Sequence, residues 1–126
     1  MGGYSFEDMP LYKEAREYRK KIYKLSRKLP VEEKYNLAGQ MRDAARSLTN
    51  NIAEGHGRYH YQENIQFLRI SRGSLEEILD DLNICIDEQY AEMEELSNLK
   101  KEGFELLHSL NRYVAYLKRR KESSLN

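Results

Sequence analysis

The chain has 126 residues, of which 40% are hydrophobic and 33% charged, and its 21 basic and 21 acidic side chains cancel to a formal net charge of zero. This length suits a single domain, residues 1–126, that buries its own core. The lone cysteine, Cys85, excludes an intrachain disulfide framework and a multi-cysteine zinc site. No apolar run approaches the ~18 residues of a membrane span and no signal sequence opens the chain, so we expect a cytoplasmic protein.

Charge is segregated along the chain although the total is zero. Residues 13–28 contain eight basic and two acidic side chains, whereas residues 76–95 contain nine acidic side chains and no basic one. A second basic run, residues 118–121, closes the chain. Such segregation gives a surface separate electrostatic fields. The alternative interpretation is that these runs are ordinary solvated helix faces.

A first helix is predicted over residues 10–29. Apolar residues recur at steps of four and three from Leu11 to Leu29, which is typical of a core-facing stripe. Pro10 suits a first helical turn, and Pro30 is expected to end the helix. A row of cations falls on the opposite side of a helical wheel: Lys13, Arg16, Lys20, Lys24 and Arg27.

A second helix is predicted over residues 31–54, with a core stripe running from Leu37 to Ile52. Gly55 is expected to end it, because glycine commonly follows the last helical residue. Arg42 and Arg46 lie four positions apart on an outer face of this helix. Residues 55–60 then form a turn, since two glycines occur within three positions.

Helices over residues 61–87 and 92–121 complete the pattern. Beside its core stripe, the third helix carries a second, partly apolar line that includes Ile70 and Ile78. Together they cover a wider face than a surface helix needs, which predicts contact with something besides the chain's own bundle. Short connections force neighbouring helices to be antiparallel. The expected fold is therefore all-α, an antiparallel up-down-up-down four-helix bundle.

Sequence signatures of an enzyme are missing. The chain contains no Gly-x-Ser-x-Gly, no His-Glu-x-x-His and no phosphate-binding glycine loop. His56 and His60 are four apart, but Gly57 between them disfavours a helical metal site. The carboxylates of residues 76–77 and 80–81 are expected to point into water, where nothing would raise a pKa. We expect no enzymatic activity, no cofactor and no metal.

Arg72 interrupts the core stripe of the third helix. A buried guanidinium needs a carboxylate or several carbonyl partners, because an unpaired buried charge is very costly. Glu54 ends the second helix, and an antiparallel hairpin would bring it near the third. We therefore predict a structural Glu54–Arg72 ion pair, with Asn51 adding a hydrogen bond. A ligand-binding role for Arg72 is the alternative.

Several segments together resemble the four-helix-bundle proteins encoded in intervening sequences of bacterial 23S ribosomal RNA genes. The first is residues 51–55, Asn-Ile-Ala-Glu-Gly, followed by Gly57-Arg58. Three further groups match in order: residues 29–30 with 33–35 and 37, residues 40–42 with 44–45 and 47, and residues 67–68 with 72–77. The similarity covers roughly residues 6–118. It implies a bundle fold, no known catalytic activity and a homopentamer.

The same superfamily includes the accessory protein of diversity-generating retroelements, which binds nucleic acid and a reverse transcriptase. The resemblance thus implies that Arg42, Arg46 and Arg58 face a nucleic acid. The leading hypothesis is a non-enzymatic oligomeric bundle that binds structured RNA or a ribonucleoprotein, with the cation row of the first helix as a phosphate track. The alternative is a protein-interaction scaffold without a nucleic-acid role, in which segregated charge docks protomers.

Overall fold

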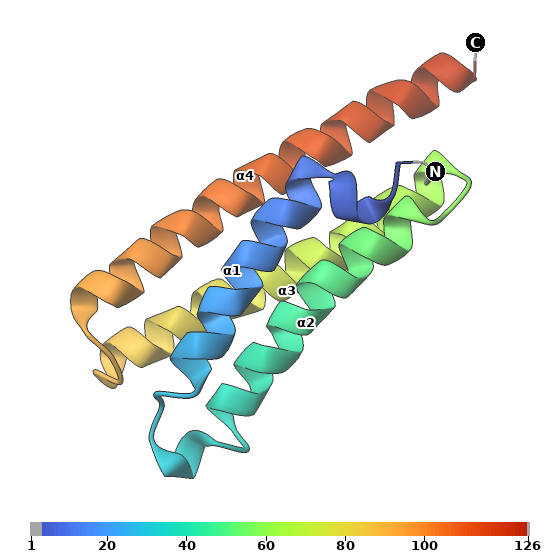
Figure 1. Ribbon diagram of the computed structural model, residues 1–126. Helices are drawn as coiled ribbons and strands as arrows, with labels where there is room; N and C mark the ends of the chain where they lie inside the picture. The colour runs from blue at the N-terminus through green and yellow to red at the C-terminus, as the bar shows by residue number, and fades with distance from the viewer. Residues whose placement is uncertain (1–3, 126) are drawn as a thin grey trace.

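The computed structural model describes residues 4–125 and is all-α (Figure 1). These residues form four α-helices and two short 3-10 helices, with no strand among them. The α-helices are α1 (Pro10–Ser26), α2 (Leu37–His56), α3 (Tyr61–Asp87) and α4 (Met93–Ser124). The 3-10 helices are η1 (Phe6–Asp8) and η2 (Val31–Glu33). The predicted all-α, four-helix class is confirmed.

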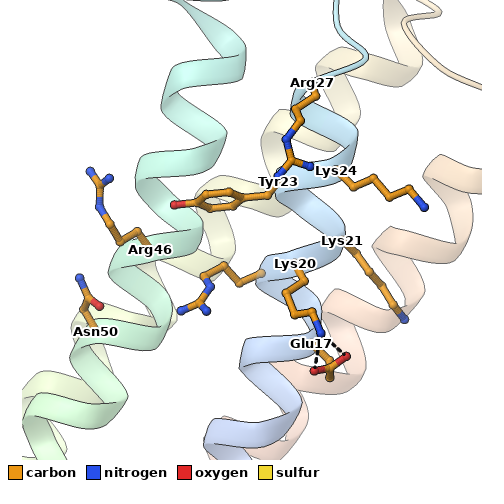
Figure 2. Close-up of a pocket in the computed structure, with 9 residues that line it drawn as sticks. Glu17, Lys20, Lys21, Tyr23, Lys24, Arg27, Arg46 and Asn50 are labelled. Atoms are coloured by element: carbon orange, nitrogen blue, oxygen red, sulfur yellow. Dashed lines mark hydrogen bonds and ion pairs between the residues drawn. The ribbon is translucent and has the colours of Figure 1, made fainter.

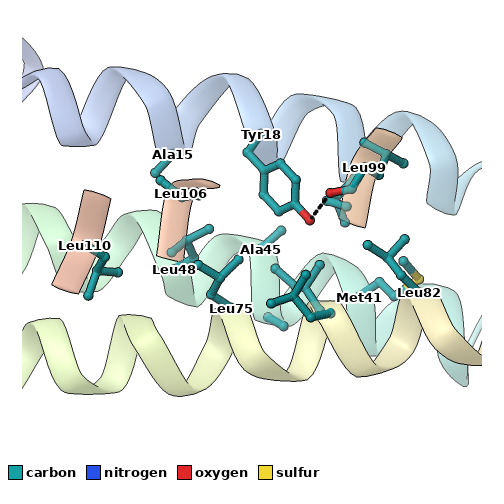
Figure 3. Close-up of a cluster of buried hydrophobic side chains, with 14 of the residues drawn as sticks. Ala15, Tyr18, Met41, Ala45, Leu48, Leu75, Leu82, Leu99, Leu106 and Leu110 are labelled. Atoms are coloured by element: carbon teal, nitrogen blue, oxygen red, sulfur yellow. Dashed lines mark hydrogen bonds between the residues drawn. The ribbon is translucent and has the colours of Figure 1, made fainter. Parts of the chain in front are cut away.

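One core runs the length of the bundle between the four helices (Figure 3). The stripes predicted from periodicity supply it, and Ile22, Leu48, Leu75 and Leu106 are fully buried. Tyr18 is also fully buried, and its hydroxyl donates a hydrogen bond to the carbonyl oxygen of Leu99 at 3.0 Å. That bond matters because a buried hydroxyl without a partner would be strongly destabilising.

Polar contacts between helices fix their register. Lys28 contacts Glu95 at 2.6 Å and Lys21 contacts Glu102 at 2.9 Å, so residue numbers fall along α4 as they rise along α1. Between α2 and α3, the Ser71 hydroxyl donates to the carbonyl oxygen of Leu48 at 2.8 Å. These contacts determine which residues of neighbouring helices lie level with one another.

The second helix begins later than the sequence predicts. Residues 31–33 form η2, and α2 starts only at Leu37. Val31 is 82% exposed, so this segment has no apolar side to hold against the core. The Glu33 carboxylate accepts hydrogen bonds from the Tyr90 hydroxyl at 2.8 Å and from the Leu37 backbone N–H at 3.4 Å, which holds this segment as the approach to α2. The prediction of a helix from residue 31 was wrong for these tertiary reasons.

Gly55 does not end α2, contrary to the prediction. The helix continues to His56, and Gly57 follows it with an ordinary right-handed backbone. Gly55 is instead buried at a close approach of α2 to α3, where a Cβ atom would lie 2.7 Å from the Asn64 side-chain oxygen. The glycine is therefore required by packing between helices.

The predicted Glu54–Arg72 pair does not form. Arg72 donates to the Asn111 side-chain oxygen at 3.1 Å, and Glu54 contacts Arg58 at 3.7 Å. Asn51 donates to the carbonyl oxygen of Ser47 within its own helix. The register of α2 on α3 explains the error. Leu48 lies level with Ser71 and Gly55 with Asn64, so Glu54 is level with a point on α3 about seven residues before Arg72. That separation is ~10 Å at ~1.5 Å per residue. The long arginine side chain instead reaches the bundle rim.

Candidate nucleic-acid interface

A basic groove runs between α1 and α2 and has a volume of about 710 Å³. Six basic side chains line it, against a single carboxylate, Glu17. In Figure 2, Tyr23 reaches across from α1 toward α2, while Arg46 and Asn50 extend from α2. The lining residues are Glu17, Arg19, Lys20, Lys21, Tyr23, Lys24, Arg27, Arg46 and Asn50. We call this surface the basic groove.

Polar contacts hold the two walls of the basic groove together. Arg19 donates from α1 to the Thr49 hydroxyl of α2 at 2.9 Å, and Thr49 donates in turn to the carbonyl oxygen of Arg46. Arg42 donates to the Ser26 hydroxyl at 3.4 Å near the end of α1. These contacts join α1 and α2 along the groove, and among its cations Lys24 and Arg27 make no ion pair within residues 4–125.

The predicted cation row of α1 is exposed along its whole length. Within residues 4–125, four of its members make no ion pair: Lys13, Arg16, Lys24 and Arg27. Lys20 contacts Glu17 at 3.3 Å, but both side chains are 61% exposed. Such a surface ion pair contributes little to stability, and salt screens the attraction between its two charges. The row therefore presents a strong positive field to solvent.

The predicted second patch of Arg42, Arg46 and Arg58 is divided. Arg46 joins the basic groove, although Asp43 contacts it at 2.9 Å, and Arg42 lies half-buried beside it. Arg58 lies apart, at the α2–α3 turn, where it stacks 4.7 Å above the Phe67 ring and contacts Glu54. Its charge is partly neutralised there, so its surroundings do not favour phosphate binding.

Of the nine lining residues, the sequence predicted Lys20, Lys24, Arg27 and Arg46 as nucleic-acid-binding. It missed the other five: Glu17, Arg19, Lys21, Tyr23 and Asn50. Arg19 and Tyr23 are half-buried, because they flank the core stripe on the side that faces α2. A helical wheel shows that such positions border the core, but it does not show which neighbouring helix they face. Basic side chains at positions that border the core stripe of α1 are the sequence signal that could have indicated these residues.

The opposite flank of α1 is neutralised by α4. Lys21 and Lys28 each contact a glutamate of α4, Glu102 and Glu95. These two glutamates also line a mixed hollow of about 550 Å³ between α1 and α4. Lys21 and Lys24 line both this hollow and the basic groove, so Arg19, Lys24 and Arg27 are the groove cations that make no ion pair within residues 4–125.

An acidic groove of about 330 Å³ lies between α2 and α3, with Asp43, Glu77 and Asp81 in its lining. The carboxylates at residues 76–77 and 80–81 were expected to point mostly into water, and Asp81 is the exception, because it is half-buried. Burial, and then the charges of Glu77 and Asp80, raise the pKa of Asp81 to about 6. Like charge around a partly desolvated carboxyl disfavours its ionised form.

Asp81→Asn is expected to stabilise the protein at pH 7 by about 1 kcal/mol, after discounting the pKa shift for solvent screening. Because the pKa of Asp81 in the folded state lies above its usual value of about 3.9, the folded state binds the proton more tightly. The contribution of Asp81 to stability therefore decreases as pH rises from about 4 to about 6. Urea denaturation across this window measures it. Asp80→Asn, at an exposed neighbouring position, is the control and should gain less stability. If the free energies of unfolding of wild type and Asp81→Asn ran parallel as pH changes, the prediction would be contradicted.

The two histidines near the α2–α3 turn make aromatic contacts. The His56 ring lies 5.7 Å from that of Tyr4, and the His60 ring lies 5.0 Å from that of Tyr59. Across residues 4–125, histidine, cysteine and acidic side chains nowhere gather in a group of three that could hold a metal ion.

The fold and its principal groove define a small all-α bundle protein with a strongly basic surface between two helices. Residues 7–112 match the sequence model of the 23S rRNA-intervening sequence protein family, and the chain belongs to that family. The resemblance noted in the sequence is thus confirmed. No curated protein matches the chain. In the part of the chain described, each helix is too short or too polar to cross a membrane.

Proposed function

We propose that this chain is a non-enzymatic, homo-oligomeric bundle protein, with its helices in up-down-up-down order, that binds structured RNA or a ribonucleoprotein through the basic groove. The observation that carries this proposal is the excess of cations there: six basic side chains and one carboxylate line the groove, and three of the cations, Arg19, Lys24 and Arg27, make no ion pair within residues 4–125. Each phosphate that these side chains neutralise releases a counterion condensed on the nucleic acid, so affinity rises with the number of phosphates contacted.

The arrangement of the α1 cations supports a backbone-binding mode. Members of the row from Lys13 to Arg27 recur every three or four residues, which spaces them by ~4.5–6 Å along the helix axis. Their side chains are long and exposed, so they can follow phosphates without reading bases. Tyr23 adds an aromatic ring to the groove wall, and aromatic rings can stack on unpaired bases.

Exposed apolar residues on α3 support the homo-oligomeric part of the proposal. Ile70, which belongs to the wide face predicted to contact another molecule, is 51% exposed, and Ile84 of the same helix is 39% exposed. The family resemblance implies five protomers. Sedimentation equilibrium tests this, and a mass of one 15.0 kDa chain would contradict it.

RNA binding is tested by fluorescence anisotropy with a labelled RNA hairpin at rising KCl concentration. The logarithm of the association constant is expected to fall linearly with the logarithm of salt concentration, with a slope of about −3 to −5 for about five phosphate contacts. Reversing three groove charges together, Lys24→Glu, Arg27→Glu and Arg46→Glu, should weaken binding by about 100-fold or more at low salt.

A matched triple variant outside the groove controls for net charge: Lys101→Glu, Lys118→Glu and Arg119→Glu. All three residues are exposed, and the change in net charge is the same. This variant should bind the hairpin within about threefold of wild type. An equal loss in both triples would move binding away from the groove. No binding at low salt would favour a protein-interaction scaffold instead.

A further inference from the structure

A mostly apolar hollow of about 390 Å³ lies between the start of α1 and the second half of α4. Three tyrosines line it, Tyr4, Tyr113 and Tyr116, together with the buried side chains of Met9 and Leu11. Its polar lining comes from α1 and α4 and includes a carboxylate, a hydroxyl and a guanidinium. We call this surface the tyrosine hollow.

Two of the tyrosines already form an aromatic stack. The ring centroids of Tyr113 and Tyr116 lie 5.8 Å apart, and the two ring planes are inclined by only 26°. Tyr113 is half-buried, whereas Tyr116 is 45% exposed. Stacked rings prefer offset, near-parallel arrangements of this kind. A planar aromatic ligand can therefore extend the stack on Tyr116, its exposed member.

Two charged side chains of the tyrosine hollow keep hydrogen-bonding capacity for a ligand. Arg112 is exposed and makes no ion pair within residues 4–125. One carboxylate oxygen of Glu14 accepts a hydrogen bond from the Ser109 hydroxyl at 3.0 Å, which leaves the other oxygen to accept a second bond. Guanidinium groups donate to the ring nitrogens and carbonyl oxygens of bases, and carboxylates accept from their amino groups. The polar edge of a nucleobase thus finds both kinds of partner beside the rings.

The charge around the tyrosine hollow favours an anion over a second copy of this chain. Arg112 and the first two members of the α1 cation row, Lys13 and Arg16, are exposed and make no ion pair within the described residues. A second copy that inserted its α4 end would bring the basic run of residues 118–121 against these cations, and like charges oppose that contact. A polyanion is attracted to the same surface.

The cation row of α1 connects the tyrosine hollow to the basic groove. The row runs from Lys13, next to Glu14 of the hollow, to Arg27, which lines the groove. The 14 residues between its ends span ~21 Å at ~1.5 Å per residue. The hollow lies on the α4 side of α1 and the groove on its α2 side, so a phosphate backbone that follows the row passes both.

We propose that the tyrosine hollow takes up an unpaired base of an RNA whose backbone follows the cation row of α1. The base extends the stack on Tyr116, and Arg112 and Glu14 bind its polar edge. Only an unpaired base can enter, because the bases of a stem are already stacked and paired. This inference rests on the proposed RNA binding and adds the kind of RNA preferred: a stem with a single-stranded segment beside it.

The test compares two labelled RNA hairpins by fluorescence anisotropy at one low KCl concentration. Both carry three unpaired nucleotides at each end of the stem, which are guanosines in one hairpin and abasic sites in the other, so that the number of phosphates is the same. The wild-type protein should bind the guanosine hairpin about tenfold more tightly, because one base stacked on an aromatic side chain contributes a factor of this order.

Three variants locate the stacked base. Tyr116→Ala should reduce the tenfold preference to less than about twofold and leave the affinity for the abasic hairpin unchanged, because the basic groove is untouched. Tyr116→Phe keeps the ring and should keep the preference. Phe104→Ala removes an aromatic ring of α4 that is 54% exposed and lies outside the hollow, and it should also keep the preference.

Four results would overturn the proposal. If the wild type bound the two hairpins equally, base uptake would be refuted while phosphate binding by the basic groove stood. If the preference persisted in Tyr116→Ala, the base would lie elsewhere, for instance on Tyr23 of the groove. If sedimentation showed that Tyr116→Ala dissociates a self-assembled form, a second copy would cover the hollow. If neither hairpin bound, the proposed RNA binding itself would fail, and base uptake with it.

Discussion

Replacing Gly103 with alanine is expected to lower the free energy of unfolding by about 3 kcal/mol. A Cβ atom at this position of α4 would lie 2.5 Å from the Tyr18 hydroxyl oxygen and 2.7 Å from a methyl group of Leu79. Both neighbours are buried, so neither can move into solvent. The displaced hydroxyl would also lose its hydrogen bond to the carbonyl oxygen of Leu99, which is 3.0 Å long.

A second glycine within a helix provides the matched control for Gly103→Ala. Gly73 lies in the middle of α3, and a Cβ atom there would meet nothing within 4 Å. Gly73→Ala should therefore stabilise the protein by about 1 kcal/mol, the ordinary advantage of alanine in a helix. Urea denaturation measures the free energy of unfolding of both variants, and its slope against urea concentration, the m value, should stay unchanged.

A double-mutant cycle tests whether the Tyr18 hydroxyl causes the clash. Tyr18→Phe removes the oxygen atom nearest to the new Cβ, so Gly103→Ala should cost at least about 1 kcal/mol less in that background. If Gly103→Ala were as stable as Gly73→Ala, or if its cost did not change with Tyr18→Phe, the close approach of α1, α3 and α4 at this level would be contradicted.

Gly55→Ala is expected to destabilise the protein by about 2 kcal/mol. The new Cβ would lie 2.7 Å from the side-chain oxygen of Asn64, 3.1 Å from its backbone oxygen and 3.2 Å from the Cβ of Phe67. Two of these three atoms belong to the fixed frame of α3, so relief would need the whole helix to shift. Interiors packed at crystal-like density resist such shifts.

Replacing Asn64 is expected to restore part of the stability that Gly55→Ala loses. Its side-chain oxygen is buried and has no hydrogen-bond partner within residues 4–125. Asn64→Ala removes that oxygen, so it should recover part of the loss caused by Gly55→Ala, while the backbone oxygen and Phe67 still oppose the methyl group. Full recovery in the double variant, or no loss in Gly55→Ala alone, would show that α2 and α3 are less closely packed here. Thermal or urea denaturation of the wild type, the two single variants and the double variant measures the recovery.

The amino-acid sequence by itself determined the four α-helices and most residues of the core, but neither of the two 3-10 helices. Apolar residues at steps of three and four lie on one face of a helix whatever its neighbours are, because helical geometry is local. The stripe of α1 from Leu11 to Leu25 and the range of α3 follow from that rule. The same rule placed the cations of α1 on the exposed side.

Tertiary structure alone decided which residues of different helices meet. The register of α2 on α3 separated Glu54 from Arg72 and gave Gly55 a packing role. The helices that neighbour α1 left its α2 flank positive and neutralised its α4 flank. The packing of α3 against α2 left the Asp81 side chain half-buried. Register and neighbour choice depend on contacts between residues far apart in the chain, which a helical repeat does not encode. Helical periodicity therefore predicted the elements, whereas the grooves arise only when the helices are packed.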